Sequence, residues 1–105
     1  ANAGSFIKNP TIPKDQYDRL LNDYANMPGY EVDSVNTKVP AGWLIEQCGW
    51  KGFRDGEIGV HKNQALVLVN YGQGKGRNIF KLALAIQASV MQKFGIDISP
   101  EVNVI

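Results

Sequence analysis

The sequence predicts a small α+β domain, in which a mostly antiparallel sheet has helices packed on one of its faces. Two observations support this prediction. Apolar residues recur with helical spacing in three segments, and short strand-like runs bounded by glycines lie in other parts of the chain. Because helices and strands are segregated along the chain, the helices are expected to gather on one face of the sheet.

The first half of the chain predicts two helices separated by a loop. Pro10 and Pro13 interrupt the opening segment before the first helix, and Pro28 ends it. Its apolar residues fall at i, i+3, i+4 and i+7: Tyr17, Leu20, Leu21 and Tyr24. Residues 31–38 are mostly polar and predict a loop. Pro40 suits the first turn of the second helix, which has one apolar face: Ala41, Leu44, Ile45 and Cys48.

The second half predicts strands around one long helix. Residues 50–59 alternate glycines with apolar and charged residues, which is typical of short strands joined by tight turns, and the apolar run 65–69 predicts a buried strand. The long helix has an apolar stripe widened by three further residues: Ile79, Leu82, Ala83, Ile86 and Val90, with Phe80, Leu84 and Met91. Gly95 ends this helix, and the alternation over 96–105 predicts a terminal strand with Pro100 at an edge or bend.

Length and charge bound the function. The 105 residues are 44% hydrophobic and 20% charged, which fits one soluble globular domain and excludes disorder. The net charge of +1 provides no overall field to attract nucleic acid or an anionic membrane. Apolar runs are too short to span a membrane and no signal peptide begins the chain, so we expect a cytoplasmic protein. Because the chain opens without Met in a turn-rich stretch, we expect it to be a piece of a longer protein.

Residue chemistry alone provides only scattered candidates. Cys48 and His61 are the only residues of their types, which excludes an internal disulfide and a multi-cysteine zinc site, and nothing else suggests that they form a catalytic pair. Ser5 follows a glycine in a turn, and Glu101 follows Pro100 at the start of a strand. For both, the simpler interpretation is structural, as a turn cap and a solvated strand end.

A glycine loop precedes the long helix and suggests a phosphate site. Gly72, Gly74 and Gly76 do not match the dinucleotide-binding fingerprint, because the third glycine comes one residue early. The acidic residue expected about 20 residues further on is also absent. A flexible connection between strand and helix is therefore the favoured interpretation.

Four separated motifs, however, carry a resemblance to a known family. They are Gly4-Ser5-Phe6-Ile7-Lys8-Asn9-Pro10, residues 41–52 (AGWLIEQCGWKG), residues 60–70 (VHKNQALVLVN) and Pro100-Glu101-Val102. In order and spacing the chain resembles, over essentially its whole length, the C-terminal domain of the MurB family. These enzymes are UDP-N-acetylenolpyruvoylglucosamine reductases, also called UDP-N-acetylmuramate dehydrogenases. Four motifs in the right order are far more specific than any one of them.

The resemblance implies a part in a bacterial oxidoreductase of peptidoglycan synthesis. Enzymes of the family hold FAD in N-terminal domains, reduce it with NADPH, and pass the hydride to UDP-N-acetylglucosamine enolpyruvate to give UDP-N-acetylmuramate. The C-terminal domain closes over this substrate. Residues 1–105 are therefore expected to form the C-terminal substrate-binding domain, with the FAD-binding domains lying upstream. Without those domains we expect the chain to retain neither FAD nor activity.

The resemblance also implies roles for individual residues. Ser5 matches the serine that protonates the carbanion or enol left by hydride transfer, and Glu101 matches the glutamate beside the enolpyruvyl group. Four further residues fall at substrate-binding positions: Asn9, Tyr30, Lys51 and Gln64. A lysine and a tyrosine hydroxyl suit a diphosphate, and amides suit a sugar or uridine. Ile7 and Asn103 depart from the family, which commonly has Phe and Arg there, so a phosphate role at position 103 is in doubt.

Two other functions stay open. The first is a non-catalytic module of the same fold, which binds a nucleotide-sugar or a protein partner. The second is a purely structural domain. Retention of both Ser5 and Glu101 argues against these alternatives, because a binding module has no need of a proton donor.

Overall fold

The computed structural model describes residues 5–56, 58–60, 68–70 and 76–102, and these form the α+β domain that the sequence predicts. The elements in chain order are β1 Ser5–Ile7, β2 Thr11–Pro13, α1 Lys14–Asp23, β3 Tyr30–Glu31, β4 Asn36–Lys38, α2 Ala41–Gln47, β5 Arg54–Asp55, β6 Ile58–Val60, β7 Leu68–Asn70, α3 Gly76–Phe94 and β8 Pro100–Val102. All three predicted helices are confirmed, and the short strands predicted over residues 50–59 are confirmed as β5 and β6, which pair with each other. No helix in these ranges is long and apolar enough to cross a membrane.

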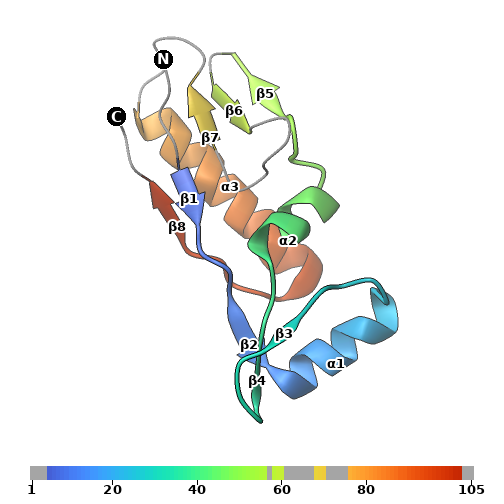
Figure 1. Ribbon diagram of the computed structural model, residues 1–105. Coiled ribbons are helices and arrows are strands. Elements are labelled where there is room, and N and C mark those ends of the chain that lie inside the picture. The colour runs from blue at the N-terminus through green and yellow to red at the C-terminus, as the bar shows by residue number, and fades with distance from the viewer. Residues whose placement is uncertain (1–4, 57, 61–67, 71–75, 103–105) are drawn as a thin grey trace.

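The described strands form three small antiparallel sheets, with the orders β1-β8, β2-β4-β3 and β5-β6-β7. In Figure 1 the β2-β4-β3 sheet and α1 lie at one end of the molecule, the β5-β6-β7 sheet lies at the other, and α3 runs between them. The first and last strands of the chain lie side by side next to α3, so the fold joins the two ends of the sequence.

The core is centred on α3. Its fully buried residues share one stripe and pack with α2 and with the segment that follows α3: Ile79, Ala83, Ile86 and Val90, together with Ala41, Leu44, Ile45, Ile96 and Ile98. Gly95 ends α3 with φ +69°, a left-handed conformation that only glycine adopts without strain. The period of 3.6 residues therefore identifies the buried side of this helix correctly.

The predicted widening of that stripe is wrong. Phe80, Leu84 and Met91 are 49%, 44% and 44% exposed. The described elements packed against α3 are α2, β6, β7 and β8, and they cover only the stripe that contains Ile79 and Ile86. An apolar residue next to the stripe thus remains at the surface because no described element covers that side.

The predicted extent of the strands needs correction in three places. Residues 31–38, predicted as a loop, include Glu31 of β3 and all of β4, and the opening segment forms β1 and β2. Within the described residues the terminal strand covers Pro100–Val102, while Ile96 and Ile98 are buried without belonging to a strand. Residues 103–105 lie outside the described ranges, as do residues 65–67 of the strand predicted over 65–69; the described part of that region is β7.

Candidate functional site

The strands that carry Ser5 and Glu101 pair directly with each other. β1 and β8 are antiparallel, with Ser5 opposite Val102, Phe6 opposite Glu101 and Ile7 opposite Pro100. The backbone positions of Ser5 and Glu101 are therefore one register step apart, although the two residues are 96 positions apart in the sequence. The structure brings these two backbone positions together; the chemical roles of the two residues remain predictions.

Asn9 connects the end of β1 to the start of α2. The backbone N–H of Ala41 donates to Asn9 Oδ1 at 2.9 Å, and the N–H of Val39 donates to the carbonyl oxygen of Pro10 at 2.9 Å. Ala41 is the first residue of α2, so its N–H has no acceptor within the helix. Asn9 thus caps α2 from a distant part of the chain, in addition to its predicted role as a substrate ligand.

Lys51 lies beyond the other end of α2. Its ammonium nitrogen is 2.8 Å from Glu46 Oε1, and both side chains are exposed to solvent. An exposed pair of this kind contributes at most about 1 kcal/mol, so solvent or an anion can compete for the lysine. Asn9 and Lys51 are therefore at opposite ends of a helix of seven residues, which spans about 10 Å.

Of the remaining predicted substrate residues, Tyr30 is not brought to the β1-β8 pair. Tyr30 is an exposed residue of β3, in register with Lys38 of β4, in the sheet at the α1 end of the molecule (Figure 1). Gln64 lies outside the described residues, as do His61, Gly72 and Gly74.

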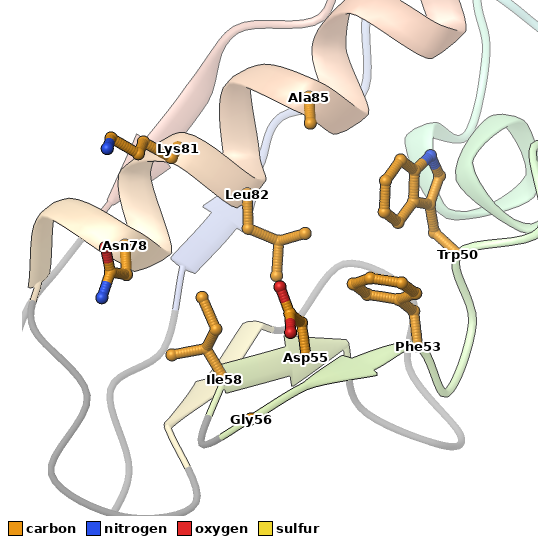
Figure 2. A pocket seen from close by; sticks show the side chains of 9 residues that line it. All are labelled: Trp50, Phe53, Asp55, Gly56, Ile58, Asn78, Lys81, Leu82 and Ala85. Carbon is orange, nitrogen blue, oxygen red and sulfur yellow. The ribbon is translucent and has the colours of Figure 1, made fainter.

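A pocket of about 560 Å³ lies between the β5-β6 hairpin and α3. Figure 2 shows its lining: Trp50, Phe53, Asp55, Gly56, Ile58, Asn78, Lys81, Leu82 and Ala85. Of the predicted site residues whose side chains the structure describes, Asn9, Tyr30 and Lys51, none is among them. Sequence reasoning missed this pocket, and the available signal was the pair of aromatic residues, Trp50 and Phe53, in a glycine-rich turn.

The aromatic wall of this pocket is held in place by hydrogen bonds. The indole N–H of Trp50 donates to Ser89 Oγ at 2.7 Å, and the Ser89 hydroxyl donates to the carbonyl oxygen of Ile86 at 2.8 Å. The rings of Trp50 and Phe53 meet edge to face, with 4.9 Å between their centroids and an angle of 79°. Asp55, Asn78 and Lys81 add polar groups to an otherwise apolar lining, so the pocket has the general character of a small-molecule site.

The Cys48 thiol at the end of α2 is not activated as a nucleophile. Burial raises the pKa of the Cys48 thiol, and the opposing effects of the Ser89 hydrogen bond and the Lys93 charge are smaller. A thiol with a raised pKa is protonated near neutral pH and reacts slowly. Within the described ranges, no group of three or more His, Cys, Asp or Glu side chains is placed to hold a metal ion.

The first backbone N–H of α1 and the first backbone N–H of α2 each have a partner within the fold. Helix N-termini bind phosphate through backbone N–H groups that lack a partner. Here the N–H of Lys14 donates to the carbonyl oxygen of Val35 at 2.9 Å, and that of Ala41 donates to Asn9. Both helices thus use their first N–H group to hold the fold together.

The comparisons with known proteins establish the family. Residues 1–105 match the sequence model described as UDP-N-acetylenolpyruvoylglucosamine reductase, C-terminal domain, and the chain belongs to this family. It is 54% identical over 104 residues to the UDP-N-acetylenolpyruvoylglucosamine reductase of Bacteroides fragilis. It is 50% identical over 102 residues to that of Pseudomonas savastanoi pv. phaseolicola, and 50% identical over 104 residues to that of Porphyromonas gingivalis.

These matches cover 97–99% of this chain but only 30–31% of each of these relatives. The chain therefore spans a little under a third of the length of the curated relatives that it matches.

Proposed function

We propose that this chain is the substrate-closing domain of a UDP-N-acetylenolpyruvoylglucosamine reductase, and that it donates the proton in the reduction of the enolpyruvyl group. The observation that carries the proposal is the pairing of β1 with β8, which brings the backbone positions of Ser5 and Glu101 together in a member of this family. The names of the relatives support the reaction, since each is called a reductase of this kind.

The reaction adds a hydride and a proton across one carbon–carbon double bond. The hydride comes from outside this chain and leaves a carbanion or enol at the neighbouring carbon. The Ser5 hydroxyl then donates its proton to that carbon, and the product is UDP-N-acetylmuramate. Serine is a very poor acid, so this step depends on holding the hydroxyl within reach of the accepting carbon.

Glu101 has a supporting role in this proposal. Its carboxylate orients the enolpyruvyl group and assists the charge and proton changes that accompany protonation. The adjacent strand supplies Ser5, so the backbone positions of both residues lie in one pair of strands.

The substrate's nucleotide-sugar part is held by residues from other elements. Lys51 is suited to a diphosphate, and the phosphate oxygens would compete with Glu46 Oε1, which lies 2.8 Å from the ammonium nitrogen. The Tyr30 hydroxyl is a second candidate for the diphosphate, and the amides of Asn9 and Gln64 suit the sugar or uridine.

The proposal assigns FAD and NADPH to other domains of the full-length protein. The coverage of the relatives supports this assignment, since the chain matches only 30–31% of their length. This chain contributes substrate binding and proton donation only.

Replacement of Ser5 in the full-length protein tests the proposal. Ser5→Ala should reduce turnover of the enolpyruvyl substrate by about two to four powers of ten, because it removes the acid that acts in the transition state. Reduction of the flavin by NADPH should continue at its normal rate, and the two half-reactions are measured separately by flavin absorbance. Unchanged turnover would instead favour a non-catalytic module, and equal losses in both half-reactions would indicate misfolding.

A further inference from the structure

We propose that Asn9 is a positioning residue for Ser5, acting through the hydrogen bond between its carboxamide oxygen and the first N–H of α2. This inference rests on the function proposed above. It assigns Asn9 a task that contact with the substrate does not include: fixing where β1 leaves the β1-β8 pair.

The start of α2 needs a cap that its own sequence does not supply. Pro40 precedes the helix and has neither an N–H group nor a side chain that can accept a hydrogen bond, and α2 has no side-chain cap at that position. The N–H of Ala41 would therefore lack a partner at a residue that is fully buried. Asn9 Oδ1, at 2.9 Å, supplies the acceptor.

The segment that carries Asn9 is stiff on both sides of this bond. Pro10 restricts its own φ and confines Asn9 to extended conformations. A second hydrogen bond, from the N–H of Val39 to the carbonyl oxygen of Pro10, lies beside the first at 2.9 Å. The connection from β1 to β2 is thus attached at two adjacent points to the segment that enters α2.

This attachment reaches the proposed proton donor through a short length of chain. β1 ends at Ile7, two residues before Asn9, and Ser5 is the first residue of the same strand. β8, the strand that pairs with β1, follows Ile96 and Ile98, which are buried in the same cluster as the core residues of α3. The bond to Ala41 therefore fixes β1 relative to the α2-α3 core, and a shift of β1 along β8 would move Ser5 relative to Glu101.

The same bond fixes which atoms Asn9 can offer to a substrate. A backbone N–H can only donate, so the carboxamide oxygen must face Ala41 and the NH₂ group must point in the other direction within the carboxamide plane. The oxygen then serves to position β1, and the NH₂ group is left to donate to the substrate. Loss of the positioning bond should therefore change the limiting rate, and loss of the NH₂ group should change the substrate concentration for half-saturation.

Three variants of the full-length protein test this inference through the reoxidation of pre-reduced enzyme by the enolpyruvyl substrate. Asn9→Ala removes the acceptor and should lower the limiting rate by about ten- to a hundredfold, as expected when a reacting group is misplaced. Asn9→Asp keeps an acceptor for Ala41 but loses the NH₂ group. It should keep its limiting rate and require a higher substrate concentration for half-saturation.

Ala41→Pro is the matched control, because it removes the donor and leaves Asn9 intact. Proline is favoured at the first position of a helix, and Pro40, with φ −64° and ψ 119°, has the extended conformation that a following proline requires. This variant should lower the limiting rate as Asn9→Ala does, with little change in half-saturation. If it fails to fold, as judged by circular dichroism, the comparison of the two Asn9 variants decides.

The inference is overturned if Asn9→Ala keeps the wild-type limiting rate, or if Asn9→Asp is slowed as much as Asn9→Ala. A different failure would concern the proposed function itself. If the wild-type protein is reduced by NADPH but is not reoxidised by the enolpyruvyl substrate, the proposed reaction is wrong whatever the Asn9 variants do.

Discussion

At the scale of single residues, the motifs locate candidates for a ligand site but not the partners of their side chains. The family resemblance implies substrate contacts at Asn9 and Lys51, and an amide and an ammonium group suit a nucleotide-sugar. In the structure the first caps α2 and the second pairs with Glu46. Neither partner was predictable, because Ala41 is far from Asn9 in sequence and Glu46 is one of several exposed carboxylates.

Asp33 provides a test of pH dependence at this scale. Its Oδ1 accepts hydrogen bonds from the N–H groups of Val35 and Asn36, each at 2.9 Å, and its Oδ2 accepts one from Asn36 Nδ2 at 3.2 Å. The backbone bond from Val35 is the main cause of a pKa lowered from its ordinary value of 3.8. The charged carboxylate thus stabilises the turn between β3 and β4.

Because folding lowers this pKa, the stabilising effect is fully present above pH 3.8 and is lost as the pH falls through the lowered value. Asp33→Asn removes the titration. The difference in melting temperature between wild type and variant should be largest near neutral pH and should shrink in acid. A difference that stays constant down to about pH 2 would contradict this account.

At the scale of elements, the helices were predictable and the short strands were not. A helix of ten residues or more repeats its apolar period several times, and α1 and α3 are of this kind. β3 has only two residues and β4 three, too few to show alternation, and their pairing depends on the turn around Asp33. The extent of the buried stripe on α3 also depends on neighbouring elements, which explains the error at Phe80.

The two sides of α3 provide a matched pair of variants. Ile86 is fully buried and Leu84 is 44% exposed on the same helix. Ile86→Ala should lower the free energy of unfolding by about 2 to 5 kcal/mol, through lost burial and the cavity left behind. Leu84→Ala should cost well under about 1 kcal/mol. Urea unfolding of the purified chain, followed by circular dichroism, measures both; similar losses would mean that the two sides of α3 are not distinguished as described.

At the scale of the whole molecule, the fold is elongated, with extents of 45 × 22 × 21 Å, and α3 runs through its centre (Figure 1). The β1-β8 pair lies on one side of α3, whereas the pocket of Trp50 and Phe53 opens between α3 and the β5-β6 hairpin. The sequence motifs indicate a substrate site at the β1-β8 pair, whereas the cavity indicates a site between α3 and the β5-β6 hairpin. The α+β class and the family were predictable from the sequence, but the existence of this second location was not.

A crystal structure of the full-length protein with the enolpyruvyl substrate bound distinguishes these locations. Our account predicts β1 paired with β8 in the register described here, with the Ser5 hydroxyl oxygen about 3 to 3.5 Å from the carbon to be protonated. The Glu101 carboxylate should lie against the same enolpyruvyl group. An enolpyruvyl group bound between Trp50 and Lys81, or one that reaches the β1-β8 strands with Ser5 turned away from it, would contradict the account.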